Sequence, residues 1–233
     1  DLGHTPFGHV GEKILDKLNP KGFKHYKQSI NVVQYLEHSS SRIGLNLTKQ
    51  TLDGIVNHSG SNKANTLEGQ IIKYSDRIAY INHDIDDSIR SNIIKHSDLP
   101  IEITEELGDR GSKRINFLVN DLVENSFDKN HIEMSDKTYR LMEDLRSFMF
   151  KNVYFNDIVR KDDKKVEYVL TNLYSYYLED ISRLPKSHTD IYNNIELQNK
   201  TKDDIVTDYI AGMTDSFAKR TFKEIFIPDS WSI

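Results

Sequence analysis

Cysteine is absent from the 233 residues, which excludes disulfides, cysteine nucleophiles and thiolate-bound metals. Any metal must be held by His, Asp or Glu, and these ligands suit hard divalent cations. Apolar runs of about 18 residues are also absent, so we expect no membrane partner. Basic residues are in deficit, with 31 Lys and Arg against 36 Asp and Glu, and the net charge of −5 argues against nucleic acid as the main partner. We therefore expect a cytoplasmic protein.

Three common catalytic motifs are missing as well. The sequence contains no GxxxxGK[ST] loop, no GxSxG elbow and no HExxH helix. P-loop nucleotide binding, serine-hydrolase chemistry and zinc-protease chemistry therefore have no support.

Helical periodicity runs through almost the whole chain, which predicts an all-α fold. Asn19, Pro20 and Gly22 should end a first helix that follows His9, and Thr48 reads as an N-cap. Residues 99–107 allow a short helix at 101–107 or, in LPIEIT at 99–104, the one modest strand candidate. Within the last predicted helix we expect Gly212 to permit close helix approach. The further helices are predicted over 25–37, 49–57, 67–90, 112–125, 135–152, 156–183 and 202–222.

The opening stretch DLGHTPFGHVGE places two histidines among three glycines and a proline. A single histidine is usually a surface or core residue, but glycine and proline here shape a tight loop that presents His4 and His9. The stretch GFKHYKQSINVV then places His25 near a helix start, where backbone N–H groups favour an anion. His25 could equally be a half-exposed residue of the capping region.

The stretch KYSDRIAYINHDIDD carries two different faces if residues 67–90 form one helix. Asp76, Tyr80 and Asp84 fall at i, i+4 and i+8, on one side. The apolar side consists of Ile78, Ile81 and Ile85. A plain amphipathic helix with a solvated acidic face explains the carboxylates, but Tyr80 among them is a residue type that stacks on sugars or bases.

These stretches together resemble the HD-domain phosphohydrolases, in particular the deoxyguanosinetriphosphate triphosphohydrolase branch. That branch reads HD-[IL]-GH-x-PFGH-x-GE at its signature, and DLGHTPFGHVGE matches it from the aspartate onward. GFKHYKQSINVV, GLNLTKQTLDGIVNH and DYIAGMTDSFA are similar to three further family motifs in the same order. The resemblance implies an all-α HD-domain bundle, with a core at 1–130 that lacks its N-terminal helices and a helical lobe at 131–233 packed on it.

The resemblance implies a reaction and assigns residues to it. The expected reaction is hydrolysis of a deoxynucleoside triphosphate (dNTP) to deoxynucleoside and inorganic triphosphate. The family holds a divalent cation, such as Mg²⁺, Mn²⁺ or another transition metal, which activates water and offsets phosphate charge. Its ligands are two histidines and two aspartates. Asp1 and Asp76 match the aspartates, whereas both histidines would precede Asp1, so we expect little or no activity from this exact chain.

The remaining roles also follow from the resemblance. His4 matches the acid or base near the leaving 5′ oxygen, while His9 and His25 match residues that contact phosphates or orient the site. Arg77 would bind the triphosphate, where a guanidinium suits bidentate contacts. Three residues would surround the nucleoside: Tyr80 against the sugar, Asp84 at the 3′-hydroxyl, and Tyr209 at the sugar or base pocket.

Two alternatives stay open at this point. One is another HD-type phosphohydrolase, acting on nucleotide monophosphates, cyclic dinucleotides or guanosine tetraphosphate. The other is a non-catalytic regulatory or scaffold protein, which two metal ligands out of four would suit. The family resemblance also implies a homo-oligomer.

Overall fold

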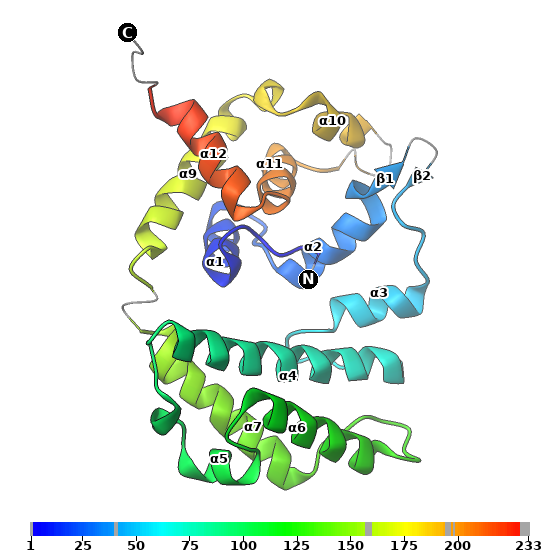
Figure 1. Ribbon diagram of the computed structural model, residues 1–233. Helices are drawn as coiled ribbons and strands as arrows, with labels where there is room; N and C mark the ends of the chain where they lie inside the picture. Colours follow the sequence, from blue (N-terminus) through cyan, green and yellow to red (C-terminus); the bar gives the residue numbers. More distant parts are fainter. Residues whose placement is uncertain (1, 40–41, 157–159, 194–196, 198, 229–233) are drawn as a thin grey trace. The chain divides into compact units, whose positions relative to one another are not determined.

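The computed structural model describes residues 2–39, 42–156, 160–193, 197 and 199–228. Helices make up nearly all of the regular structure (Figure 1), so the predicted all-α fold is confirmed. Within these residues the only strands, β1 (His38–Ser39) and β2 (Arg42–Ile43), form one short antiparallel pair. No helix in this part of the chain is both long and apolar enough to cross a membrane.

The chain divides into two compact units. Unit 1 comprises residues 1–56 and 162–233, and unit 2 comprises residues 57–161. These divisions differ from the boundary expected after residue 130, because α7 (Asp136–Met149) packs on α4 (Leu67–Arg90) within unit 2. The assignment of residues 1–130 to a functional HD-domain core stays a prediction.

Unit 1 brings the two ends of the sequence into one core. Helix α1 (Gly8–Leu18) packs on α9 (Asp163–Glu179), which also contacts α11 (Lys202–Ala211) and α12 (Asp215–Phe226) (Figure 1). Side chains buried in this core include Leu15, Phe23, Leu170, Leu173, Val206, Ile210 and Ala218. The other elements of unit 1 are α2 (His25–Asn31), the π-helical turn η1 (Val32–Leu36), α3 (Lys49–Val56), η4 (Ile181–Arg183), α10 (Lys186–Thr189) and η5 (Asp190–Asn193).

A buried carboxylate, Asp208 of α11, ties α2 to the C-terminal segment of unit 1. Gln28 Nε2 and Asn31 Nδ2, both on α2, donate to Asp208 Oδ1 at 2.8 Å each. The Tyr192 hydroxyl donates to Oδ2 at 2.8 Å, and Lys200 Nζ lies 3.4 Å from the same oxygen. Because a buried carboxylate is costly unless it is hydrogen-bonded, this network fixes the position of α2.

Unit 2 is built around α4. The Thr66 hydroxyl caps this helix by accepting from the Gly69 N–H at 3.2 Å. The predicted apolar stripe of α4 is confirmed, because Ile78, Ile81 and Ile85 are all buried. The stripe packs on α7 and α6 (Gly111–Ser126), and unit 2 also contains η2 (His96–Asp98), α5 (Ile101–Glu106) and the π-helical turn η3 (Phe150–Tyr154).

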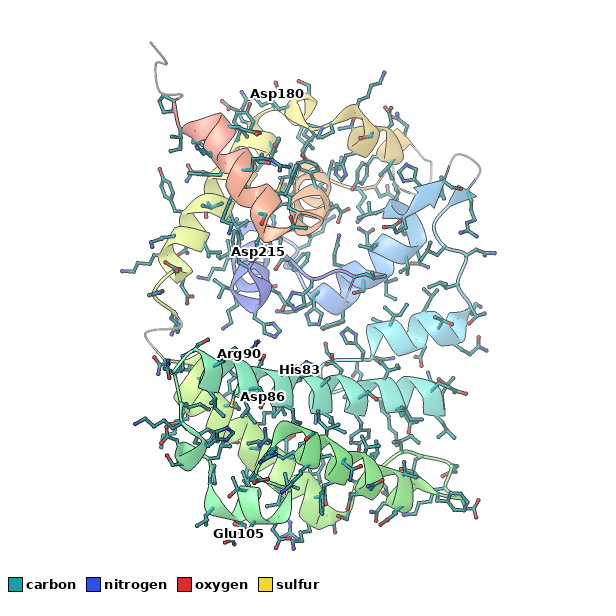
Figure 2. The ribbon with its side chains drawn as sticks, in the orientation of Figure 1. His83, Asp86, Arg90, Glu105, Asp180 and Asp215 are labelled. Atoms are coloured by element: carbon teal, nitrogen blue, oxygen red, sulfur yellow. The ribbon has the colours of Figure 1, made fainter. Side chains whose placement is uncertain are left out.

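A buried arginine also holds α6 against α4. Arg114 of α6 is fully buried, and its Nε donates to Asn82 Oδ1 at 2.8 Å. Asp86, which projects from α4 (Figure 2), lies 3.6 Å from Arg114 Nη2. These contacts add polar specificity to an interface that is otherwise apolar.

The short helix predicted at 101–107 is confirmed as α5, and the modest strand candidate at 99–104 does not form: α5 begins after Pro100, and the buried Ile103 and Leu107 follow helical spacing. One helix prediction and one glycine prediction are wrong. The helix expected over 202–222 ends at Ala211, because the Thr214 hydroxyl caps a new helix, α12. Gly212 lies at this break, where an added Cβ would meet only ordinary contacts at 3.5 Å, so no close helix approach requires glycine there.

Candidate functional site

The loop before α1 lies directly on the backbone of α2. A Cβ on Gly3 would come within 2.2 Å of Ser29 N and 2.3 Å of His25 O, so no other residue fits at this position. The Gly3 N–H donates to Ser29 Oγ at 3.0 Å. At the other end of the loop, the Phe7 N–H donates to Asp215 Oδ1 at 2.8 Å, at the start of α12 (Figure 2). The loop is therefore held at both ends.

The predicted acid–base residue, His4, lies close to the two histidines expected to contact phosphates or orient the site. The ring centroid of His4 lies 5.0 Å from that of His25 and 5.2 Å from that of His9. The rings of His9 and His25 are 6.2 Å apart. Phe7 and Gly8 have left-handed backbone conformations, with φ of 63° and 58°, which turn the chain sharply between His4 and His9. We name these three side chains the imidazole cluster.

The carboxylate of Glu12 contacts two histidines of the imidazole cluster. Its Oε1 accepts from the backbone N–H of His25 at 3.0 Å and lies 3.1 Å from His25 Nδ1, while Oε2 lies 3.3 Å from His9 Nδ1. Burial alone raises the pKa of Glu12, but the hydrogen bonds from His25 and His9 outweigh it and lower the pKa well below its usual value. Glu12 is therefore ionised at neutral pH and orients two imidazoles.

His4 is electrostatically different from its neighbours. Burial lowers the pKa of His4, and the positive charges that His25 and His9 can carry lower it further. The neutral form of His4 is thus favoured at neutral pH. A neutral imidazole can take up a proton and, once protonated, can donate it, which is the chemistry expected of an acid–base residue.

The second set of predicted residues lies on α4 in unit 2. Arg77 Nη1 is 3.2 Å from Glu143 Oε1, and Arg146 Nη1 is 3.2 Å from Glu143 Oε2, so one carboxylate of α7 bridges two guanidinium groups. Burial raises the pKa of Tyr80 despite the opposing charges of Arg146 and Arg77. The Tyr80 hydroxyl is therefore neutral and lies beside two cations.

Asp84 has a specific partner from η3. The Tyr154 hydroxyl donates to Asp84 Oδ2 at 2.5 Å. Burial and this carboxylate both raise the pKa of Tyr154, so the hydroxyl keeps its proton and remains a donor. The pair fixes the orientation of the Asp84 carboxylate, which can still accept further hydrogen bonds through its other lone pairs.

The remaining predicted residues are less well placed for a shared role. Tyr209 of α11 packs in unit 1, with its ring centroid 5.2 Å from that of Tyr177 and 5.1 Å from that of His188. Its role at a sugar or base pocket stays a prediction. Asp76 lies on α4, and Asp1 lies outside the described residues. Among the described residues, no three His, Asp or Glu side chains are grouped so that they could hold a metal.

Sequence reasoning missed four residues of these two sets: Glu12, Glu143, Arg146 and Tyr154. Glu12 follows His9 at i+3 on a helix, so its proximity could have been predicted from spacing. The other three lie on α7 and η3, and their contacts depend on how α7 packs on α4. No local pattern carries that information.

Comparisons with known proteins agree with the family resemblance of the sequence motifs. Residues 132–224 match the family model described as phosphohydrolase-associated domain. A protein of Caldanaerobacter subterraneus subsp. tengcongensis is 45% identical over 231 residues, which cover 99% of this chain and 66% of the relative. A Clostridium perfringens protein is 43% identical over 237 residues, covering 98% and 67%, and a Geobacter sulfurreducens protein is 33% identical over 279 residues, covering 98% and 71%. Each of the three is named deoxyguanosinetriphosphate triphosphohydrolase-like protein, and this chain spans 66% of the first one's length.

Proposed function

Because the chain belongs to the deoxyguanosinetriphosphate triphosphohydrolase-like family, we propose that the whole protein hydrolyses dNTPs to deoxynucleoside and inorganic triphosphate. The single observation that carries this proposal is the imidazole cluster with Glu12, because His4, His9 and Glu12 belong to the stretch that resembles the family signature. Hydrolysis at the ester bond takes a proton from the attacking water and delivers one to the leaving 5′ oxygen; His4, neutral beforehand, would accept the first proton and then donate it.

The orientation and exposure of the histidines in the imidazole cluster suit contact with a phosphate substrate. Glu12 holds His25 and His9 through its two oxygens, so both rings keep a defined orientation. The His9 side chain is 75% exposed and can reach a ligand, whereas His25 is buried beside Glu12. We assign contact with phosphate oxygens to His9 and support of the cluster to His25.

The residues on α4 suit the other parts of the substrate. Arg77 and Arg146 form a pair of guanidinium groups whose bridging partner, Glu143, phosphate oxygens could replace. Tyr80 would pack against the deoxyribose, and Asp84 would accept from the 3′-hydroxyl. The hydrogen bond from Tyr154 supports this assignment of Asp84, because it holds the carboxylate in one orientation.

The proposal includes a divalent cation, and Asp1 and Asp76 are the two residues of this chain proposed as its ligands. The described residues do not by themselves form a metal site, so we derive no step through a metal. The requirement is tested directly by removing metals with a chelator and adding back Mg²⁺ or Mn²⁺. Cytoplasmic location and homo-oligomerisation stay predictions, and light scattering after size-exclusion chromatography tests the second.

The decisive experiment incubates the whole protein with each dNTP and separates the products by chromatography. We expect deoxynucleoside and triphosphate in equal amounts. Release of orthophosphate or pyrophosphate would instead indicate another phosphohydrolase, and no release at all would favour a scaffold role. Replacement of the 2′-hydrogen by a hydroxyl, with ribonucleotides as substrates, tests the proposed contact of Tyr80 with the sugar.

A variant pair separates acid–base chemistry from general damage. His4→Gln should lower the rate by about 10²–10⁴, the usual loss when an acid–base residue is removed. The control is His96→Gln, which changes an exposed histidine in η2 and should leave the rate unchanged. Equal rates for the two variants would exclude His4 as the proton donor.

A further inference from the structure

A pocket of about 410 Å³ lies within unit 2, beside the N-terminal half of α4. Its walls are the loop at Gly60–Ala64, the α4 residues Gln70, Lys73, Tyr74 and Arg77, and two residues from beyond α6, Ile132 and Tyr139. A volume of this size falls in the range of small-ligand sites. Only Arg77 among these residues belongs to the proposed dNTP site, so the rest of the pocket has no role yet.

The lining of this pocket is positive in an acidic protein. It contains three cationic side chains, Lys63, Lys73 and Arg77, and no carboxylate is among the lining residues. A second pocket of the same unit, of about 710 Å³, has the opposite character. One lysine, Lys113, lines it together with five acidic residues: Glu105, Glu106, Asp109, Asp121 and Glu124. Charge is thus sorted between the two pockets, and the smaller one favours an anion.

The cations of the smaller pocket are held close together. Lys73 and Arg77 are one turn apart on α4, and the Lys73 ammonium donates to the backbone carbonyl of Asn62 in the loop. Burial lowers the pKa of Lys73, and the charge of Arg77 lowers it further. An anion between these side chains would relieve that repulsion. Glu143, the carboxylate paired with Arg77, contacts it from α7 and does not line the pocket.

Two tyrosines supply neutral donors in the same pocket. Burial raises the pKa of Tyr74, and the nearby Tyr139 adds to the effect, so the Tyr74 hydroxyl keeps its proton at neutral pH. Tyr139 of α7 is 43% exposed and is therefore accessible to a ligand. Ammonium, guanidinium and phenol groups together form the donor set that a phosphate group with several oxygens requires.

We propose that this pocket binds a polyphosphate chain, with Lys63 and Lys73 as contacts in addition to Arg77. The proposal that the pocket binds polyphosphate depends only on the residues that line it. The identification of that chain as the phosphates of the substrate rests on the proposed function, through the shared Arg77. Both lysines are then binding residues that family resemblance does not assign.

The test measures binding of inorganic triphosphate to the purified protein by calorimetry, near physiological ionic strength. Lys73→Gln and Lys63→Gln should each weaken binding by about tenfold, the value of one charge-assisted hydrogen bond. Lys73→Arg should retain most of the affinity. The matched control, Lys113→Gln, removes the same charge from the acidic pocket and should leave affinity unchanged within about twofold.

Three results would overturn the proposal: no saturable binding by the wild type, equal weakening by Lys113→Gln, or weakening by His4→Gln without any by Lys73→Gln. Thermal melting of each variant shows that it is folded. Hydrolysis kinetics then distinguish the source of the phosphates. A raised KM for dNTP in Lys73→Gln identifies them as those of the substrate, and an unchanged KM identifies a separate phosphorylated ligand. If triphosphate binds but no dNTP is hydrolysed, the result supports polyphosphate binding by the pocket and contradicts the proposed function.

Discussion

Asp208 offers the sharpest test of how unit 1 is held together. Its side chain is 3% exposed, and its two oxygens accept from Gln28, Asn31 and Tyr192 at 2.8 Å each, with Lys200 Nζ at 3.4 Å. Asp208→Asn keeps the shape of the side chain but replaces one acceptor oxygen by an NH₂ donor and removes the negative charge. The change therefore alters the hydrogen bonds and the charge at Asp208 while it leaves the packing volume nearly the same.

The expected loss can be estimated bond by bond. A hydrogen bond to a charged group contributes about 1.5–3 kcal/mol and a neutral one about 0.5–1.5 kcal/mol, so each of the three short bonds loses about 1 kcal/mol. The NH₂ group also faces the ammonium of Lys200 or the amides of α2, and one donor is left unsatisfied. We expect a total loss of about 3–5 kcal/mol, which lowers the melting temperature by about 6–20 °C in a protein of this size.

Thermal and urea unfolding, followed by circular dichroism, measure this loss. Asp190→Asn is the control, because Asp190 is exposed and its contact with Asn193 is long, at 3.4 Å; its effect should stay within about 0.5 kcal/mol. A loss below about 1 kcal/mol for Asp208→Asn would refute the reasoning. In that case the donors around Asp208 would find other partners, and α2 would not depend on this carboxylate.

Three further predictions concern the site residues and the contact of α1 with the loop before it. Burial lowers the pKa of His4 in the folded state, so the unfolded chain takes up a proton on this histidine at a higher pH than the folded chain does. The free energy of unfolding should therefore fall as the pH drops below about 6.5. Unfolding experiments at about pH 7.5 and 5.5 should show a smaller fall for His4→Gln than for the wild type. Gly11→Ala should destabilise the protein by about 3 kcal/mol or more, because the new Cβ would lie 2.0 Å from the backbone oxygen of Pro6; a melting temperature equal to that of the wild type would contradict the close approach. Tyr154→Phe removes the donor to Asp84 and should cost about 1–3 kcal/mol of stability while raising KM for dNTP, and steady-state kinetics with an unchanged KM would show that this hydrogen bond does not position Asp84 for the substrate.

The sequence pattern predicted local structure well where one helix face decides it. The helix over residues 67–90 has the expected bounds, and Ile78, Ile81 and Ile85, at helical spacing, are all buried in one core. The proximity of His4 and His9 also follows from local features, since glycines and one left-handed turn bring these two residues together. In these cases, residues within a few turns of one another determine the geometry.

Contacts between distant segments could not be predicted in this way. The pattern of α7 indicates an amphipathic helix but says nothing of the contacts of Arg146 with the residues of α4. Asp208 lies in a recognisable motif, yet two of its partners, Gln28 and Asn31, lie 180 and 177 residues away. Helix packing and long-range hydrogen bonds determine these positions, and the local periodicity of a sequence carries no information about either.

Contacts between the N-terminal and C-terminal segments of unit 1 impose an order on folding during synthesis. Phe7 bonds to Asp215 over a separation of 208 residues, and Asn19 bonds to Thr207 over 188. Unit 2, by contrast, is one continuous segment and can fold while residues beyond it are still being translated. The loop before α1 can therefore take its final place only after Asp215 has been translated. In a nascent chain that stops before residue 200, unit 2 can fold, but the loop before α1 lacks its contact with Asp215.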